Sequence, residues 1–491
     1  MTLRPIRFFH RATITELHAV PPTRTVLEWL REDQQLIGSK EGCAEGDCGA
    51  CMVVLGEVND AGQLALRPVN ACIQFVPTLD GKALFTVEDL AGAHGALHPV
   101  QQSMVDQHGS QCGFCTPGFV MSLWALYQRH LAAGTRPTRQ QLADDLSGNL
   151  CRCTGYRPIL DAGLAMFEAP AVPLQAEPVL AALKTLASDP PLQTASGFFA
   201  PQTRAELAAL LGAHPRAQLL AGSTDVGLWV NKQLREFVQV IYLGRVAEMQ
   251  RIDEVDDHLL IGAGASLEAA WSALALHWPA LTEVWQRFAS LPIRQVGTMG
   301  GNVANGSPIG DSAPALMALG ALIVLQRGAH TREMPMQDFY TGYMKSQLQA
   351  GEFVQALRVP LPAAGGAPAA VRVYKISKRF DCDISALCAA FSITLQGAVV
   401  NEVRLAFGGL AATVARAAKA EAALRGQPWT EATLLAGMAA LALDFRPLSD
   451  MRASSAYRAQ VAQNLLRRFW LETRPDAALL AHRVSVFSRA A

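Results

Sequence analysis

The chain has 491 residues, half of them apolar, and its 42 Lys and Arg residues are balanced by 42 Asp and Glu residues. This length and composition predict several packed domains and argue against a disordered chain. The zero net charge and the lack of a long basic run argue against nucleic acid or an acidic membrane surface as the main partner.

The N-terminus and the overall hydropathy give no sign of export or membrane insertion. Charged and imidazole side chains interrupt any apolar export signal in the first twenty residues, namely Arg4, Arg7, His10, Arg11, Glu16 and His18. No run of eighteen apolar residues predicts a transmembrane helix. Clustered cysteines in a long chain without an export signal indicate metal binding rather than disulfides. We therefore expect a cytoplasmic protein with no membrane partner.

Residues 1–82 are expected to form a small β-rich domain. Ile6–Phe9 and Cys51–Leu55 predict strands, and Thr25–Leu30 predicts the start of a short amphipathic helix. The stretch Gly38–Gly49 contains four glycines. Glycines at this density suit a loop that wraps closely around a ligand.

Residues 83–165 have a helical pattern. After Thr116–Pro117, apolar residues recur at three- and four-residue steps until Gly134. Thr138 predicts the N-cap of a second helix that runs through Leu146, with Gly148 just past its end. We expect four helices with a metal cluster between their ends.

The rest of the chain divides into three parts. Residues 166–192 are rich in Ala and Pro and are expected to be an interdomain linker that has room for one short helix. Residues 193–365 alternate strand-like and helical runs and predict an α+β domain. Residues 366–491 predict a further domain with strands at Ala389–Leu395 and Val403–Phe407 and Ala-rich helices through 426–443.

Eight of the ten cysteines form two quartets of different spacing in the first 153 residues. The first quartet is Cys43, Cys48, Cys51 and Cys72, and its C-x4-C-x2-C spacing is that of plant-type [2Fe–2S] ferredoxins. Backbone N–H groups of the glycine-rich loop can stabilise the negative charge of such a cluster. A structural zinc site also uses four thiolates, but usually as paired C-x2-C motifs.

The second quartet is Cys112, Cys115, Cys151 and Cys153. Its C-x2-C and C-x-C spacing is less diagnostic and leaves zinc open as an alternative. Its position directly after a ferredoxin-like loop favours a second iron–sulfur cluster. Electrons are therefore expected to pass through this part of the chain.

The sequences around both quartets resemble those of a known enzyme family. Glu41–Cys51 is similar to the first iron–sulfur domain, and His108–Gly118 with Gly148–Pro158 to the second, of the molybdenum hydroxylases. This family includes xanthine dehydrogenases, aldehyde oxidases and carbon monoxide dehydrogenases. The resemblance implies a ferredoxin-like β-grasp domain, a four-helix [2Fe–2S] domain, an α+β FAD-binding domain that is not a Rossmann fold, and a C-terminal α/β flavoprotein domain.

Two glycine-containing loops continue the resemblance. The turn Ala221–Val226 exposes N–H groups that can cradle a diphosphate, although an ordinary strand–helix turn has the same composition. The loop Gly297–Asn305 would let the backbone approach a ligand closely. The resemblance implies that FAD is held by Ala221, Gly222, Ser223, Thr224, Asp225, Val226, Phe288, Thr298, Gly300, Gly301, Asn302, Asn305, Asp311 and Lys375. The family often has Thr at the position of Asn305.

Several other motifs receive weaker interpretations. Gly262–Gly264 lacks the third glycine and the acidic partner of a Rossmann fingerprint and is read as a strand end. Arg379–Asp383 resembles the family's loop beside the flavin, where NAD+ approaches, and a charged surface turn is the alternative. Cys382 and Cys388 are expected to be buried or incidental. The histidines near the second quartet are expected to be structural: His94, His98 and His108.

The resemblance implies that the chain is the iron–sulfur and flavin subunit of a xanthine dehydrogenase, because no molybdopterin domain is expected in it. A separate molybdopterin-binding subunit would oxidise hypoxanthine and xanthine to urate, with two copies of each chain. Electrons would pass through the second and then the first cluster to FAD and to NAD+. The alternatives are a subunit that serves aldehyde or other N-heterocycle oxidation, a free-standing NADH-linked flavoprotein, and a redox sensor.

Overall fold

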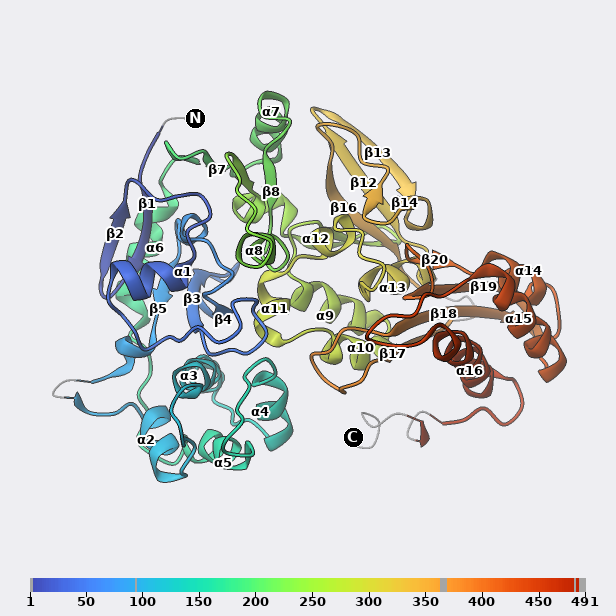
Figure 1. The fold of residues 1–491 in the computed structure, drawn as a ribbon, viewed down its shortest axis with the longest axis horizontal. Helices are drawn as coiled ribbons and strands as arrows, with labels where there is room; N and C mark the ends of the chain where they lie inside the picture. The colour runs from blue at the N-terminus through green and yellow to red at the C-terminus, as the bar shows by residue number, and fades with distance from the viewer. Residues whose placement is uncertain (1–2, 93–94, 363–368, 481–482, 485–491) are drawn as a thin grey trace. The chain divides into compact units, whose positions relative to one another are not determined.

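A computed structural model describes residues 3–92, 95–362, 369–480 and 483–484. The chain folds into two compact units (Figure 1). Unit 1 comprises Met1–Ala247 and Ser290–Gly297, and unit 2 comprises Glu248–Ala289 and Thr298–Ala491. The boundary expected at 365/366 and the side chain of His94 lie outside the described residues. The multidomain α+β fold expected from the sequence is confirmed.

Unit 1 begins with a five-stranded mixed sheet in the order β2-β1-β5-β3-β4. The strands are β1 (Ile6–His10), β2 (Thr13–Leu17), β3 (Met52–Val58), β4 (Leu64–Asn70) and β5 (Ala83–Phe85). β1 pairs parallel with β5, and the other neighbours are antiparallel. A short helix, α1 (Val26–Glu28), starts at a Thr25 capping box and continues as a π-helical turn, Trp29–Asp33. The loop that carries Cys43, Cys48 and Cys51 leads directly into β3, and Cys72 follows β4.

Four helices follow and form the expected helical domain. They are α2 (Pro99–Asp106), α3 (Thr116–Ala133), α4 (Arg139–Asp145) and α5 (Arg157–Ala165). Gly134 ends α3 in a left-handed conformation, with φ of 63°, and the Thr138 side chain caps α4. Both sequence predictions for these helix ends are confirmed. The second quartet therefore lies at helix ends.

The segment expected to be a linker contains a regular helix, α6 (Ala176–Ala187). Val179, Leu183 and Leu186 follow a four- and three-residue step and are buried in the same hydrophobic core as α3. One face of α6 therefore belongs to the packed interior of unit 1, which the composition of the segment did not indicate.

Unit 1 also contains a small four-stranded sheet in the order β6-β7-β9-β8. Its strands are β6 (Leu192–Gln193), β7 (Phe198–Ala200), β8 (Gln218–Leu220) and β9 (Val240–Tyr242), with helices α7 (Arg204–Ala213), α8 (Val226–Asn231) and α11 (Leu291–Val296). β8 and β9 pair in parallel. The chain leaves β8 through the turn 221–225 and enters α8, so this sheet positions the first glycine-containing turn.

Unit 2 begins with a five-stranded antiparallel sheet in the order β10-β11-β16-β12-β13. The strands are β10 (Ile252–Val255), β11 (His258–Gly262), β12 (Leu322–Arg327), β13 (His330–Pro335) and β16 (Phe353–Pro360), and a hairpin is formed by β14 (Tyr340–Gly342) and β15 (Lys345–Ser346). The helices are α9 (Leu267–His277), α10 (Thr282–Arg287), α12 (Met299–Ala304) and α13 (Ser312–Ala318). Gly262 is the last residue of β11, which confirms its interpretation as a strand end.

The C-terminal part of unit 2 is a second sheet covered by helices (Figure 1). Its strands, in the order β17-β18-β19-β20, are β17 (Ala370–Ile376), β18 (Leu387–Gln396), β19 (Val399–Gly408) and β20 (Ala415–Arg416). The helices are α14 (Ala418–Leu424), α15 (Glu431–Asp444) and α16 (Ser455–Thr473). Their apolar faces form one core around Phe391, Phe407 and Phe469.

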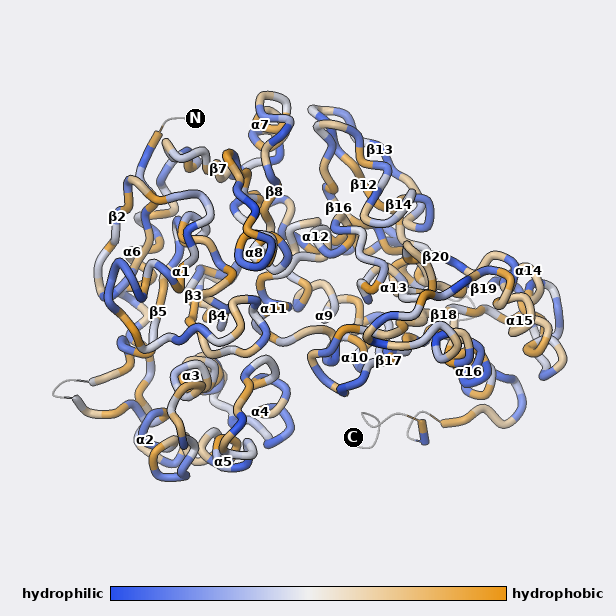
Figure 2. The backbone as a smooth tube through the Cα atoms, viewed as in Figure 1, coloured by the Kyte–Doolittle hydropathy of each residue, from blue (hydrophilic) through white to orange (hydrophobic). Residues whose placement is uncertain are grey.

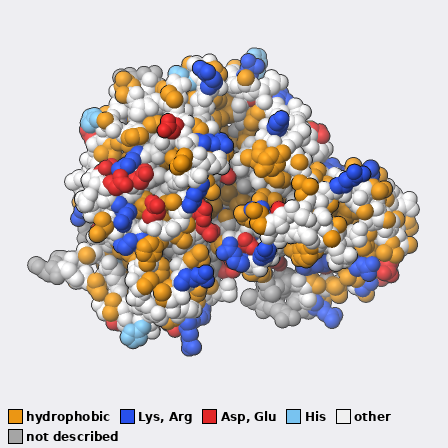
Figure 3. All heavy atoms as spheres, in the orientation of Figure 1, with side chains coloured by type: hydrophobic (Ala, Val, Ile, Leu, Met, Phe, Trp, Pro, Cys, Tyr) orange, Lys and Arg blue, Asp and Glu red, His pale blue; other side chains and the backbone are white. Residues whose placement is uncertain are grey.

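The polarity of the chain varies along every part of the fold. Hydrophobic and hydrophilic residues are interspersed along the chain (Figure 2), and none of the described helices is long and apolar enough to cross a membrane. On the face shown in Figure 3, basic and acidic side chains are intermixed rather than gathered by sign. This distribution agrees with the zero net charge of the sequence.

Candidate functional site

The structure brings the four cysteines of the first quartet together. The Sγ atoms of Cys51 and Cys72 lie 3.3 Å apart, and Cys43 contacts both Cys48 and Cys72 through their side chains. None of the four forms a disulfide. The four thiols that the C-x4-C-x2-C spacing predicts as cluster ligands thus lie together in the fold.

The loop around the first quartet turns its N–H groups toward sulfur. The backbone N–H groups of Asp47 and Cys48 both donate to Cys43 Sγ, each at 3.4 Å. Such donors stabilise the negative charge of a four-thiolate iron–sulfur cluster. Gly46 and Gly49 have φ of 78° and 73°, which L side chains rarely adopt. These glycines let the loop wrap closely around the thiols, as their density in the sequence predicts.

Thiol contacts also shift the acidity of the first quartet. Hydrogen bonds from Cys48 and Cys72 lower the pKa of Cys43, whereas hydrogen bonds to Cys43 and Cys51 raise the pKa of Cys72. These contacts therefore favour the ionised form of Cys43 over that of Cys72. Because thiolates are the metal-binding form, binding a metal at this site must release protons.

The second quartet is also assembled, near the surface of the helical domain. Cys112 contacts Cys153, and Cys115 contacts Cys151. Cys112 and Cys153 are exposed, whereas Cys151 is buried. Burial is the main cause that raises the pKa of Cys115, to about 12. This quartet therefore has one exposed edge and one edge that faces the protein interior.

The contacts between the thiols differ between the two quartets. One zinc would need four sulfurs about 2.3 Å from the same centre. In the second quartet the thiols meet in two pairs, as they would if each of two irons took two thiolates. In the first quartet Cys43 contacts both Cys48 and Cys72, and the N–H donors to its sulfur suit a negatively charged iron–sulfur cluster. The residues present thus fit [2Fe–2S] clusters.

The two quartets are joined by direct backbone contacts. Leu150 N–H, which precedes Cys151, donates to the carbonyl of Cys48 at 3.0 Å. A Cβ built on Gly118 would lie 2.1 Å from the carbonyl oxygen of Gly49, so only glycine permits this approach. The ligand loops of the two quartets therefore form one closely packed structure.

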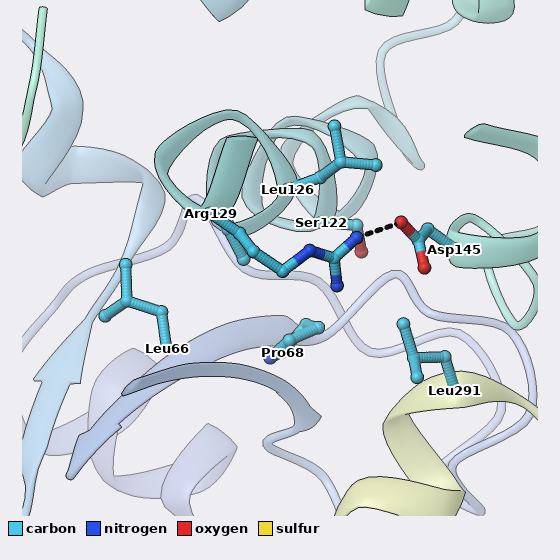
Figure 4. Close-up of a pocket in the computed structure, with 8 residues that line it drawn as sticks. Leu66, Pro68, Ser122, Leu126, Arg129, Asp145 and Leu291 are labelled. Atoms are coloured by element: carbon cyan, nitrogen blue, oxygen red, sulfur yellow. Dashed lines mark hydrogen bonds and ion pairs between the residues drawn. The ribbon is translucent and has the colours of Figure 1, made fainter. Parts of the chain in front are cut away.

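A small surface pocket lies beside this structure but has a different character (Figure 4). Its polar feature is the ion pair between Arg129 of α3 and Asp145 of α4. The other lining residues are Leu66, Pro68, Ser122, Ala125, Leu126 and Leu291. No cysteine and no residue of a glycine-containing loop lines it, so it reflects the packing of α3 and α4 against β4 and α11.

In unit 1, the turn Ala221–Asp225 has the features of a ligand cradle. Ser223 has φ of 65° and is 3 % exposed, yet its Oγ has no hydrogen-bond partner among the described residues. A Cβ on Gly222 would lie 1.9 Å from the carbonyl oxygen of Val296, so a side chain cannot be accommodated there. The Ser223 hydroxyl is therefore buried without a partner within the described part of the chain, on a turn that requires glycine at position 222. Such a hydroxyl fits an anionic ligand such as a diphosphate.

In unit 2, the loop before α12 provides a second such cradle. Thr298 caps the helix by accepting from Gly301 N–H at 3.1 Å, and a Cβ on Gly300 would lie 2.3 Å from that of Ala263. The buried Asn302 Oδ1 has no partner among the described residues. Asn305 ends the helix. The residues of this loop that are predicted to bind FAD are therefore held close together. The side-chain oxygen of Asn302 remains available to a ligand.

Asp311 and Lys375, both predicted to contact flavin, contact each other. Lys375 Nζ lies 2.5 Å from Asp311 Oδ2 and donates to Ser385 Oγ at 2.9 Å, while Ser385 Oγ donates to Asp311 Oδ1 at 2.7 Å. All three side chains are buried. Cys388 is buried as well, and desolvation followed by the charge of Asp311 raises the pKa of its thiol. The structure therefore pairs Asp311 with Lys375, and the contact of each with flavin stays a prediction.

Phe288 lies next to the anchor of the loop 379–383. The guanidinium of Arg287 lies 4.3 Å from the centre of the Phe380 ring, and its Nε donates to the Phe380 carbonyl at 3.0 Å. Phe288 itself is 7 % exposed and packs against Trp271. Cys382 has φ of 51°. The loop 379–383, which resembles the family's loop beside the flavin, is thus held by Arg287. Arg287 directly precedes Phe288, the aromatic residue predicted to lie near the flavin.

Several residues at these sites carry no signal in the local sequence. At the end of α8, Asn231 and Lys232 donate to carbonyls of the loop that carries Cys43, Cys48 and Cys51, named here the first-quartet loop, and Asn231 also donates to the carbonyl of Cys72. In unit 2, Ser385 completes the buried ion pair. The residues that they contact are distant in the sequence, so no local pattern marks them. The sequence feature that could have drawn attention to Asn231 is its position at the end of the helix that follows the glycine-containing turn 221–225.

The sequence matches four known domain families in the same order along the chain. Residues 10–76 match a 2Fe-2S iron-sulfur cluster binding domain, and residues 86–164 match a [2Fe-2S] binding domain. Residues 193–362 match the FAD binding domain in molybdopterin dehydrogenase. Residues 372–473 match the CO dehydrogenase flavoprotein C-terminal domain. The matches cover both quartets and both glycine-containing loops.

Known proteins resemble the chain over most of its length. It is 33 % identical to xanthine dehydrogenase of Emericella nidulans over 95 % of this chain, and 32 % identical to that of Drosophila subobscura over 83 %. The chain spans 38 % and 34 % of those relatives, little more than a third of their length.

Solved structures resemble part of the chain. A chain of carbon monoxide dehydrogenase from Hydrogenophaga pseudoflava is 27 % identical, with a TM-score of 0.53 over 57 % of this chain and 96 % of that one. A chain of quinoline 2-oxidoreductase from Pseudomonas putida 86, at 23 % identity, shares the fold with a TM-score of 0.52 over 58 % of this chain and 99 % of its own.

Proposed function

Because the chain belongs to the molybdenum hydroxylase family and carries its iron–sulfur and flavin domains, we propose that it is the electron-transfer subunit of a xanthine dehydrogenase. The observation that carries this proposal is the packing of the two quartets within unit 1. Leu150 N–H, next to Cys151, donates to the Cys48 carbonyl, and Gln74, two residues after Cys72, donates to the Gly222 carbonyl. The similarity to xanthine dehydrogenases over nearly the whole chain favours a purine substrate.

The cofactors that we propose follow from the two cysteine quartets and the glycine-containing loops. The quartets would hold two [2Fe–2S] clusters, and FAD would be held by residues of the turn 221–226, of Thr298–Asn302, and by Asn305. When bound, these groups would supply one-electron transfer from the molybdenum cofactor of a partner subunit and two-electron transfer from FAD to NAD+. The chain itself contributes binding, orientation and the N–H donors that stabilise the clusters. We place the enzyme in the cytoplasm.

The exposed edge of the second quartet is the proposed contact with the partner subunit. Cys112 and Cys153 are exposed there, and three large side chains on the same loops are also exposed: Phe114, Leu150 and Tyr156. Exposed aromatic and aliphatic side chains around a redox centre suit a protein–protein contact that excludes water. A molybdopterin-binding subunit would deliver electrons at this edge, with two copies of each chain in the assembly.

Anaerobic purification of the full chain with its partners tests the proposal. We expect four irons and one FAD per chain, a co-purifying molybdopterin-binding subunit, and reduction of both clusters and the flavin by xanthine. Reduction by NADH should reach the same centres from the flavin side. Absence of a molybdopterin-bearing partner would contradict the subunit assignment, and reduction by aldehydes but not by xanthine would contradict the substrate.

Replacing Gly222 with alanine is expected to weaken FAD binding by at least about tenfold, or about 1.4 kcal/mol. The new Cβ would meet the Val296 carbonyl at 1.9 Å, a backbone atom that cannot move without displacing the turn. Flavin content after dialysis and titration with FAD measure the loss. Gly212→Ala in α7 is the matched control, because no atom lies within 4 Å of the Cβ that it adds. Equal FAD binding by both variants would contradict the assignment of this turn.

A further inference from the structure

Carbonyl groups of the first-quartet loop accept hydrogen bonds from residues outside the loop, and they point away from the thiols. Two N–H groups of this loop point inward to Cys43 Sγ, which leaves the neighbouring carbonyls facing the surrounding protein. Asn70 Nδ2 donates to the Gly46 carbonyl at 2.8 Å, and Leu150 N–H donates to that of Cys48. The inward direction of the N–H groups therefore depends on what holds the carbonyls outward.

Helix α8 supplies the remaining bonds. Asn231 Nδ2 donates to the carbonyls of Ala44, at 3.0 Å, and of Cys72, at 2.7 Å. Lys232 Nζ donates to the Cys43 carbonyl at 2.5 Å and lies 3.9 Å from Glu45. The Asn231 amide thus connects the residue after Cys43 to Cys72, which are the first and last cysteines of the quartet.

The same helix is fixed to the glycine turn at its other end. Gln74, two residues after Cys72, donates to the Gly222 carbonyl at 3.1 Å. A Cβ on Gly227 would lie 2.8 Å from the side chain of Ile73, so the helix backbone packs directly on the residue after Cys72. All of these residues belong to unit 1. The position of α8 relative to the first quartet is therefore set at both ends.

We propose that Asn231 is a positioning residue for the first [2Fe–2S] cluster, which holds the ligand loop so that its N–H groups point at sulfur and thereby favours the reduced cluster. The physical basis is that hydrogen bonds to the sulfurs stabilise the added negative charge of reduction. Lys232 supports the same loop and adds a positive charge beside it. This inference rests on the proposed function only in that the first quartet must hold a [2Fe–2S] cluster.

The test is an anaerobic redox titration of the full chain with its partners, followed by electron paramagnetic resonance of each cluster. Asn231→Leu removes both donated hydrogen bonds at similar volume. We expect it to lower the reduced-to-oxidised ratio of the first cluster about tenfold at a fixed potential, equivalent to about 59 mV for one electron. The second cluster and the flavin content should not change. Gln233→Leu is the matched control, because Gln233 is an exposed amide two residues further on.

Each outcome of the titration decides the proposal. A shift confined to the first cluster supports it, whereas identical potentials in Asn231→Leu and Gln233→Leu overturn it. Equal shifts of both clusters would indicate general loosening and also overturn it. If Asn231→Leu fails to load iron, Lys232→Met decides instead, because Lys232 is exposed: a smaller shift in the same direction supports the proposal and no shift overturns it. Failure of the proposed function would appear separately, as missing clusters in the wild-type protein.

Discussion

NADH is expected to reduce both clusters in the wild-type protein, only the first-quartet cluster in a Cys153→Ala variant, and no cluster in a Cys43→Ala variant. The reason is the order of contacts in unit 1. The first quartet contacts the turn 221–226 through Gln74 and helix α8, and the loop of the second quartet contacts the first through Leu150 and Cys48. Because electron transfer falls steeply with distance, removal of the first cluster should isolate the second from the flavin.

The measurement is stopped-flow reduction by NADH under argon, with the two cluster signals separated by electron paramagnetic resonance. Dithionite is the control, since it should reduce whichever cluster remains and so show that this cluster is intact. Both substituted cysteines are at least partly accessible, and Cys153 is exposed, which limits the damage to folding. NADH reduction of the second cluster in Cys43→Ala at the wild-type rate would contradict the order proposed for electron transfer.

The sequence predicted those parts of the sites that depend on local pattern. Cysteine spacing predicted the first ligand set, its position after that set together with the family resemblance predicted the second, and the structure brings the thiols of each set together. The ends of α3 and α4 followed from Gly134 and Thr138, whose effects act within one helical turn. The assignment of the glycine-containing loops to FAD came from the family resemblance and stays a prediction for each residue.

Features that depend on distant partners could not be predicted in this way. Asn231 reaches carbonyls 187 and 159 residues away, and nothing in its own neighbourhood marks it as a donor to a cysteine loop. The burial of helix α6 was missed for a different reason: prolines dominated the composition of 166–192 and hid the spacing of Val179, Leu183 and Leu186. Composition averages over a segment, whereas burial depends on one face of it.

Replacing Lys375 with methionine is expected to destabilise unit 2 by about 3–5 kcal/mol, because it leaves the Asp311 carboxylate buried without its charged partner. Asp311 is 3 % and Lys375 is 5 % exposed, and Ser385 provides only a neutral hydrogen bond. For a unit of this size the loss corresponds to a fall of roughly 6–20 °C in Tm. Differential scanning calorimetry would measure it. Arg251→Met is the control, since its ion pair with Asp253 is exposed and worth about 0–1 kcal/mol.

The double variant Asp311→Asn with Lys375→Met separates the ion pair from the flavin contact that the family resemblance implies for the same residues. Without a buried charge, the double variant should regain most of the stability lost by Lys375→Met, because the cost of the single variant comes from the unpaired carboxylate. If the two residues serve only to neutralise each other, the double variant should also bind FAD normally. If they contact FAD as well, stability should return while flavin content stays low. Failure of the double variant to recover stability would contradict the ion-pair explanation itself.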